Sequence, residues 1–192
     1  MPRARLSGTP SGVAVQRALT DFMKMKLFVA GGVILLLLLA CEWPLHVLVL
    51  KNTRNGRWVF ARVVSPGDVF TLSYIHSVKR KEVKDFYVIG QEYEIIQNKT
   101  VFPDSDFGLP SRAVGTETYT LQPDGNGCIS GMHRLIPSLL LRVEKAYDNT
   151  LTINETPPID LSQRLGNCVV ELRMHSMNPI RYAFQATMLY GE

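Results

Sequence analysis

The sequence has little of what metal sites, redox centres and common hydrolase sites require. It contains three cysteines and four histidines in 192 residues. The histidines stand singly, and there is no Cys-x-x-Cys pair and no zinc-finger spacing. A Gly-x-Ser-x-Gly elbow and a phosphate-binding glycine loop are also missing. The sequence therefore predicts no metal and no cofactor, and it contains no standard catalytic motif.

An excess of positive charge is also missing over most of the chain, although the formal net charge is +4. Five of the 21 basic residues and one of the 17 acidic residues precede Cys41, which leaves 16 of each sign after it. A neutral remainder lacks the broad basic surface that nucleic-acid-binding domains present. We therefore predict no nucleic-acid partner.

A single long apolar run stands near the N-terminus. Lys24 and Lys26 precede Leu27 to Ala40, which carries no charge. A basic segment followed by about 7–15 apolar residues is typical of a signal peptide, whereas a full membrane span needs about 20. Residues 1–22 resemble no folded element, and a start at one of the two methionines just before the run would be more usual.

The run ends in Leu38-Leu39-Ala40-Cys41, which resembles the lipobox of bacterial lipoproteins. Three interpretations stay open. Cys41 is lipidated after cleavage, the segment is retained as an anchor with Trp43 at the interface, or the protein is simply secreted. All three place the following chain outside a bacterial membrane. We therefore expect a tail of residues 1–41, as signal peptide or anchor, and one domain of residues 42–192 facing the periplasm or the cell exterior.

The two remaining cysteines, Cys128 and Cys168, lie in that domain. In an oxidising compartment they could form a disulfide that closes a loop of about 40 residues and adds about 3–4 kcal/mol of stability. Two free thiols on separate strands are the alternative.

The domain reads as many short strands separated by Gly, Pro and Asn turns, without a sustained helical period. Asn55-Gly56 is a strong hairpin signal, and the segments on either side of Pro137 are expected to pair. The pattern predicts an all-β domain, an antiparallel β-sandwich or a barrel-like fold. The predicted strands are Leu45–Leu50, Arg57–Val64, Val69–Val78, Glu82–Ile89, Glu92–Gln97, Lys99–Phe102, Thr116–Gln122, Cys128–Leu135, Ser138–Lys145, Thr150–Asn154, Asn167–His175 and Ile180–Leu189.

The most distinctive segment, Val69 to Asp85, begins as one of these strands. Its apolar side chains alternate with polar ones from Phe70 to Val78, which predicts one buried face. Adjacent strand residues point to opposite faces, so His76 and Ser77 cannot serve each other as base and nucleophile. The structural interpretation is a histidine that hydrogen-bonds a nearby carboxylate or the backbone, and the functional one is ligand binding.

The basic run Lys79-Arg80-Lys81 follows. Such a run is most often a solvated turn, and Glu82 and Asp85 are close enough in sequence to offset its charge. The alternative is a contact with an anion or a partner, because Arg pairs well with carboxylates and phosphates.

At Tyr74-Ile75-His76-Ser77-Val78 the sequence resembles the domain of unknown function 1850 family of bacteria and archaea. The similarity includes the preceding Gly67-Asp68 turn, Val83 and Asp85 after the basic run, and Gly108-Leu109-Pro110. The loop before Gly108 is less glycine-rich here than is usual in the family.

The resemblance covers most of the chain from Leu45 to Arg173, and residues 178–192 have no counterpart. The family consists of small exported or membrane-anchored proteins without an assigned activity. They are often encoded beside the fused permease and the binding protein of TAXI-type TRAP transporters. The resemblance thus implies an accessory role in solute uptake, with the permease or the binding protein as partner.

Three functional hypotheses follow. The first is a non-enzymatic interaction module, held at the membrane by the N-terminal segment, that docks on a transporter. The second is a hydrolase-like or ligand-modifying envelope enzyme that uses His76 with Asp85 or Asp106. The third is an envelope lipoprotein of purely structural use. We favour the first, and its expected binding residues are Tyr74, His76, Ser77, Arg80, Asp85, Asp106, Gly108, Pro110 and Arg112.

Overall fold

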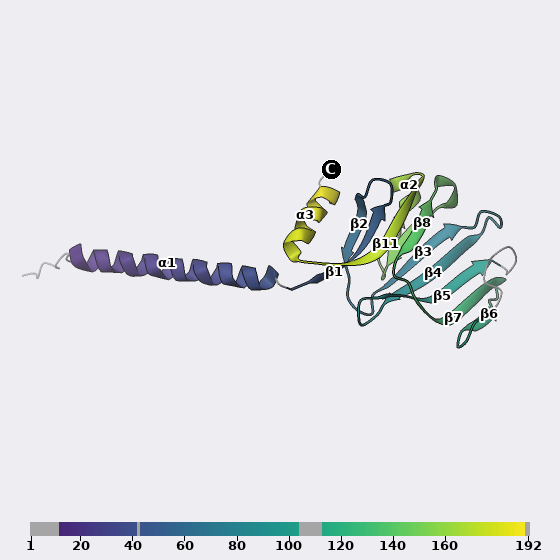
Figure 1. Cartoon of the computed structure of the whole chain (residues 1–192), viewed down its shortest axis with the longest axis horizontal. Helices are drawn as coiled ribbons and strands as arrows, with labels where there is room; N and C mark the ends of the chain where they lie inside the picture. The colour runs from purple at the N-terminus through teal and green to yellow at the C-terminus, as the bar shows by residue number, and fades with distance from the viewer. Residues whose placement is uncertain (1–11, 42, 104–112, 191–192) are drawn as a thin grey trace, which may run out of the picture. The chain divides into compact units, whose positions relative to one another are not determined.

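The computed structural model describes residues 12–41, 43–103 and 113–190 (Figure 1). The chain divides into two compact units, Met1–Trp43 and Pro44–Glu192. The first unit holds one long helix, and the second holds two β-sheets.

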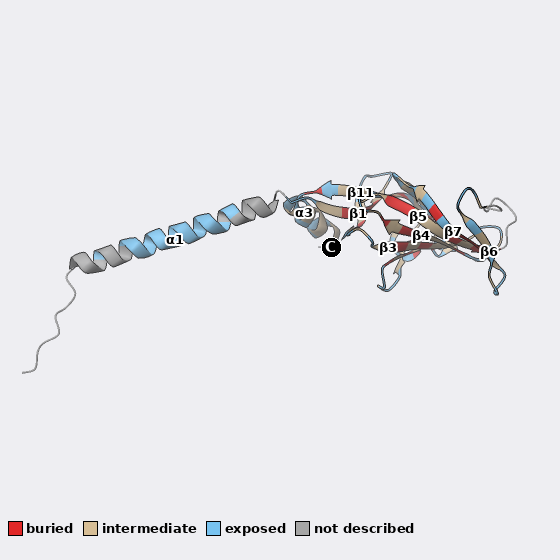
Figure 2. Ribbon diagram, turned by 90° about the horizontal axis from the view of Figure 1, so that it is seen from below, coloured by how far each residue is buried: buried red, intermediate tan, exposed pale blue. Residues whose placement is uncertain are grey.

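Helix α1 spans Gly12–Cys41. Its first turns correct the expectation that residues 1–22 contain no folded element, because the helix already includes residues 12–22. Ala, Leu, Gln and Arg, which are good helix formers, are frequent in that stretch. The described side chains of α1 are exposed (Figure 2), and Leu27 and Phe28 reach 76% and 85% exposure. Among the described residues, we find no helix that combines the length and apolarity needed to cross a membrane.

The second unit is built from two antiparallel sheets (Figure 1), which confirms the predicted sandwich-like all-β fold. Sheet A has the order β2-β1-β11-β8, and sheet B has the order β10-β9-β3-β4-β5-β7-β6. The strands of sheet A are β1 (Leu45–Asn52), β2 (Trp58–Val63), β8 (Leu139–Val143) and β11 (Cys168–Met177). Those of sheet B are β3 (Val69–Ile75), β4 (Glu82–Ile89), β5 (Ile95–Pro103), β6 (Thr118–Leu121), β7 (Asn126–Leu135), β9 (Thr150–Ile153) and β10 (Ile159–Asp160). Two short helices, η1 (Lys145–Tyr147) and α2 (Leu161–Leu165), lie where the chain passes between the sheets.

The core lies between the two sheets. Leu48 and Leu172 come from sheet A, Phe70 and Leu151 come from sheet B, and each is at most 2% exposed within one cluster. The cluster follows from the alternation in sequence, because every second residue of a strand points to the same face. Burying one such side chain contributes about 1.5–3 kcal/mol. The red segments of Figure 2 show buried residues lying along the strands.

Helix α3 (Pro179–Tyr190) stands where the sequence predicts a strand over Ile180–Leu189. Alternate residues of this segment are apolar, which favours a strand, but a helix start signal precedes them. The Oδ1 of Asn178 accepts the backbone N–H of Arg181 at 2.8 Å. Pro179 follows directly as the first helical residue, where its fixed φ is suited to a helix. The strand prediction for this segment is therefore wrong.

The inner side of α3 packs on the outer face of sheet A. Tyr182 and Leu189 contact a cluster that contains Val47, Val49 and Ala61. These three strand residues alternate with the residues of the central core, so sheet A has apolar contacts on both faces.

One strand pairing and one strand boundary differ from the sequence prediction. Cys128–Leu135 and Ser138–Lys145 do not pair with each other, because β7 lies in sheet B and β8 lies in sheet A. Pro137, which has no N–H for a strand ladder, lies in the crossing between the sheets. Ile95–Gln97 and the predicted strand Lys99–Phe102 belong to one strand, β5, with an irregular register between its two halves, whereas Glu92–Glu94 of the first predicted strand precede β5.

Of the two alternatives for Cys128 and Cys168, the structure has the free thiols on separate strands, and the disulfide is not formed. Cys128 lies on β7 in sheet B, and Cys168 begins β11 in sheet A. A disulfide needs Cα atoms within about 7 Å, whereas packed sheets are about 10 Å apart. Burial raises the pKa of the Cys168 thiol, which keeps it in the less reactive protonated form.

Candidate functional site

Strand β3 ends at Ile75, before the predicted limit of Val78. His76 and Ser77 therefore lie in the turn that leads to β4, and not on opposite faces of a strand. Val78, predicted on the buried face, is 61% exposed. The alternation earlier in the strand is as predicted, since Phe70 is 2% exposed.

The ring of His76 stabilises this turn. Its Nδ1 accepts the backbone N–H of Val78 at 3.3 Å and that of Lys79 at 3.2 Å. The backbone N–H of His76 donates to the carbonyl of Lys81, and the N–H of Arg80 donates to the carbonyl of His76, both at 2.9 Å. These bonds hold Arg80 at a left-handed φ of 54°, which costs about 1–2 kcal/mol outside glycine. The turn is thus a fixed frame that presents the exposed Arg80 and Lys81 to solvent.

The same contacts bear on a catalytic use of His76. A general base is usually oriented through a hydrogen bond to a third group such as a carboxylate. Here Nδ1 is taken by the backbone, and no hydrogen bond joins His76 to a carboxylate within the described residues. Four other predicted site residues lie outside the described residues: Asp106, Gly108, Pro110 and Arg112.

Asp85 places a carboxylate on the inner face of sheet B. On β4 it stands between Val83 and Tyr87 at alternate positions, and these neighbours are 1% and 3% exposed. Its Oδ1 accepts the hydroxyl of Thr100 at 2.7 Å and the side-chain amide of Gln97 at 3.2 Å, both from β5. Burial raises the pKa of Asp85, and the two hydrogen bonds oppose that rise.

Two tyrosines share these surroundings. Burial, followed by the charge of Asp85, raises the pKa of Tyr74 to about 12. Burial, followed by the charges of Asp85 and Tyr74, raises the pKa of Tyr87 as well. Both phenols therefore stay protonated at neutral pH and can donate hydrogen bonds. Tyr74 and Asp85 are thus half-buried on the inner face of sheet B, whereas Ser77 and Arg80, predicted for the same site, are exposed in the turn.

Replacing Asp85 with asparagine is expected to change how stability depends on pH. Because the folded state raises the pKa of Asp85, its favourable contribution is full below the unfolded pKa and is lost as pH rises through the folded value. The free energy of unfolding of Asp85→Asn, relative to the natural chain, should therefore increase between about pH 4 and about pH 8. Urea unfolding of both chains across this range measures it. A constant difference would contradict the buried position of the carboxylate.

A groove of about 580 Å³ lies on the outer face of sheet B, next to the turn. The register that pairs Phe86 with Lys99 places side chains of β4 and β5 side by side in it. The Nζ of Lys99 lies 4.0 Å from the centroid of the Phe86 ring, a cation–π contact. The lining residues are Lys81, Glu82, Lys84, Phe86, Lys99, Val101, Gln122, Asp124 and Asn126.

The acidic groups of this basic groove are already engaged by neighbours. Glu82 pairs with Lys84 at 2.9 Å. Asp124 accepts the backbone N–H of Asn126 at 3.0 Å and its side-chain amide at 2.8 Å, and the first of these contacts is the main reason that its pKa is lowered. Among the described residues, Lys81 and Lys99 form no direct ion pair, although the charge of Lys81 helps to lower the pKa of Asp124. These two ammonium groups are therefore the ones most able to bind an anionic partner.

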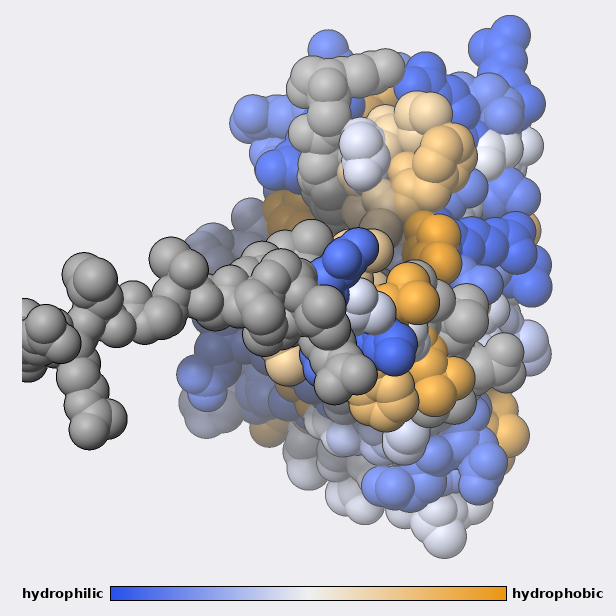
Figure 3. Space-filling model, turned by 90° about the vertical axis from the view of Figure 1, so that its left-hand side faces the viewer, coloured by the Kyte–Doolittle hydropathy of each residue, from blue (hydrophilic) through white to orange (hydrophobic). Residues whose placement is uncertain are grey.

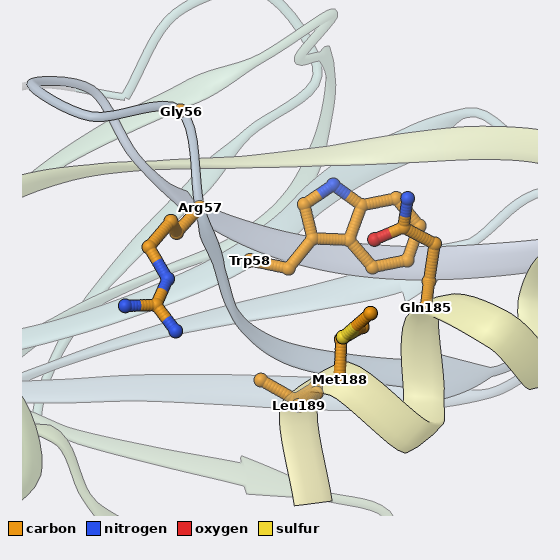
Figure 4. Close-up of a pocket in the computed structure, with 6 residues that line it drawn as sticks. All are labelled: Gly56, Arg57, Trp58, Gln185, Met188 and Leu189. Carbon is orange, nitrogen blue, oxygen red and sulfur yellow. The ribbon is translucent and has the colours of Figure 1, made fainter.

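A second pocket, of about 290 Å³, lies between the β1–β2 hairpin and α3 (Figure 4). The side chains of Gln185 and Met188 lie beside the indole of Trp58. The hairpin contributes Gly56, Arg57 and Trp58, and the helix contributes Gln185, Met188 and Leu189.

Trp58 also contacts His175 of β11, with ring centroids 5.8 Å apart. The Nε2 of His175 is buried and has no hydrogen-bond partner among the described residues. Burial, together with the charges of Arg173 and Lys51, lowers the pKa of His175. The imidazole ring of His175 is therefore uncharged at neutral pH.

Acidification is expected to destabilise the domain through His175. Its folded pKa lies below the ordinary value of about 6.5, so the unfolded chain binds the proton first, and stability is lost as pH falls from that value toward the folded one. A His175→Gln variant, which stays neutral, should lose less stability than the natural chain between about pH 7.5 and about pH 5. Urea unfolding at the two pH values measures this, and equal losses in both chains would contradict it.

The structure thus defines a β-sandwich domain. A polar cluster lies on the inner face of sheet B, and a basic turn and groove lie on the surface of the domain. Residues 70–158 match the family described as Domain of unknown function (DUF1850). This match confirms the resemblance to the family drawn from the Tyr-x-His-Ser-Val segment. The matched region includes the turn, Asp85 and Lys99, and it contains neither α1 nor α3. No curated protein and no solved structure matches the chain.

Proposed function

We propose that the protein is a membrane-anchored, extracytoplasmic β-domain that serves as an accessory interaction module of a TAXI-type TRAP solute transporter. Its partner is the permease or the binding protein of that transporter. It has no catalytic role of its own, and it faces the periplasm or the cell exterior.

The observation that carries the proposal is the basic turn and groove. Arg80 and Lys81 project from a turn whose backbone is held by hydrogen bonds to the ring of His76. Beside it, Lys99 lies over an aromatic ring in a groove of about 580 Å³. The domain as a whole is neutral in sum, so this local cluster is suited to an acidic protein surface of defined shape rather than to a polyanion.

The anchoring part of the proposal is supported by the N-terminal unit. Exposed apolar side chains follow each other along α1, and Leu27, Phe28 and Val29 are 76%, 85% and 59% exposed. Exposed apolar surface of this extent is costly in water and marks contact with a protein or a membrane. The Leu-Leu-Ala-Cys sequence ending at Cys41 supports lipidation as the means of attachment.

The partner is tested by co-purification. The full chain with an affinity tag is expressed with the permease and binding protein of the proposed transporter, and membranes are solubilised in a mild detergent. We expect the permease or the binding protein to elute with the full chain. Recovery of the chain alone, while the transporter stays intact in the same extract, would rule out the proposed role.

Anchoring is tested separately by the intact mass of the mature protein from membranes. Lipidation predicts a chain that begins at Cys41 and carries added acyl mass, whereas a retained anchor predicts an unmodified chain that includes residues 27–40. A mature chain that starts after Cys41 and is found free of membranes would show simple secretion and would contradict anchoring.

A further inference from the structure

Helix α3 carries a stripe of exposed apolar side chains besides those that pack on sheet A. Ile180, Phe184 and Met188 are 65%, 61% and 61% exposed, and Met188 also borders the pocket beside Trp58. Residues four apart lie above each other on one side of a helix, so the three side chains form a continuous line. The opposite side is already occupied, because Tyr182 and Leu189 pack on the sheet.

The exposed side of α3 also lacks the charges that surface helices normally carry. Arg181 is the single charged residue between Pro179 and Tyr190. Figure 3 shows apolar side chains exposed beside hydrophilic ones on the face of the molecule that it views. A helix with apolar residues on both sides requires a second apolar environment beyond the domain itself.

The register of sheet A places the start of α3 at the same end of the domain as Leu45. Leu45, the first strand residue after the N-terminal segment, pairs with Met177 at the end of β11. Helix α3 begins two residues later, at Pro179. Trp43, two residues before Leu45, is 78% exposed. The point where the chain enters the domain and the point where α3 starts are therefore neighbours across one strand pair.

We propose that the exposed stripe of α3 lies in the interfacial layer of the membrane to which the N-terminal segment attaches. This inference rests on the anchoring in the proposed function, because that attachment brings the Leu45 end of sheet A to the bilayer. Ile180, Phe184 and Met188 enter the region between head groups and acyl chains, and Arg181 lies among anionic head groups. The domain is then held at two points and cannot rotate freely about its tether.

The shape of the stripe favours a lipid surface over a protein partner. A helix that docks on a protein inserts its anchors into a preformed groove, whereas an interfacial helix sinks only about 5–10 Å into the bilayer. Three side chains in a single line on a convex helix match the shallower contact. A second copy of the chain and a transporter subunit are the alternatives that the experiment must separate.

The experiment uses the full chain in vesicles of phosphatidylethanolamine and phosphatidylglycerol. In one sample, Phe184 is replaced by the photo-reactive amino acid p-benzoylphenylalanine. In a control sample, Leu140 of β8, which is 68% exposed, is replaced in the same way. After sedimentation of the vesicles and irradiation, mass spectrometry identifies the adducts at each position.

We expect the chain to sediment with the vesicles and position 184 to form at least about five times more lipid adduct than position 140. Sedimentation without this excess, or a protein adduct at position 184, would overturn the α3 inference and leave anchoring intact. A chain that stays in the supernatant would overturn both proposals together.

Discussion

Replacing Phe70 with alanine is expected to lower the free energy of unfolding by about 3–5 kcal/mol. Phe70 is 2% exposed, and its ring stacks on Tyr87 with centroids 4.7 Å apart and planes 10° from parallel. The substitution removes the largest side chain that β3 contributes to the core between the sheets and leaves a cavity there. Because small domains are stable by only about 5–15 kcal/mol, a loss of this size should be evident in urea unfolding followed by circular dichroism.

The neighbouring residue gives a matched control. Val69 lies on the same strand but faces outward and is 45% exposed. Val69→Ala should change the free energy of unfolding by no more than about 0.5 kcal/mol. Similar losses in the two variants would contradict the assignment of the faces of β3, on which the placement of the interior polar cluster also depends.

Reversing two charges in the groove is expected to weaken partner binding at least ten-fold, about 1.4 kcal/mol or more. In Lys81→Glu/Lys99→Glu, two attractions toward an acidic surface become repulsions, and Glu82 and Asp124 add to the repulsion. The measurement is the amount of permease or binding protein retained by the tagged chain over a range of salt concentrations. The natural complex should weaken as salt increases, because screening shortens the range of its ion pairs.

A control variant with the same change in net charge separates the groove from a general effect of charge. Lys145→Glu/Arg164→Glu alters two exposed residues of η1 and α2, outside the lining of the groove. It should retain the partner as the natural chain does. Equal loss in both double variants would show that net charge, and not the groove, governs binding.

Local patterns in the sequence predict most strands but not how they are shared between the sheets. Alternation and the Asn55-Gly56 turn are signals within a few residues, and the hairpin of β1 and β2 forms as they indicate. The separation of β7 from β8 depends on long-range packing, so the segments around Pro137 read as a simple hairpin although they belong to different sheets.

The wrong strand prediction over Ile180–Leu189 could have been avoided from the local sequence. Alternating apolar residues from Ile180 to Met188 resemble a strand, yet Asn178 and Pro179 form a helix start in which the Asn side chain caps the N–H of Arg181. Here the capping residues predict the helix better than the spacing of the apolar residues does. The helix has apolar residues on two sides, so it shows no single hydrophobic face.

The candidate site was accessible to sequence reasoning only in part. An acidic residue on an apolar face, as Asp85 is between Val83 and Tyr87, is a readable signal for a buried polar cluster. Its partners Gln97 and Thr100 are not readable, because their positions depend on the register of β5 and its irregularity. The same register brings the lysines of the groove together. The basic turn can therefore be predicted from the sequence, but the groove beside it cannot.

Site-specific photo-crosslinking in cell membranes tests the proposed docking surface most directly. The full chain carries p-benzoylphenylalanine at Arg80 in one strain and at Lys145 in another, and each strain also expresses the permease and the binding protein of the proposed transporter. We predict a crosslink from position 80 to the permease or the binding protein and none from position 145. Crosslinks to a transporter subunit from position 145 alone, or equal yields from both positions, would contradict docking through the basic turn and groove.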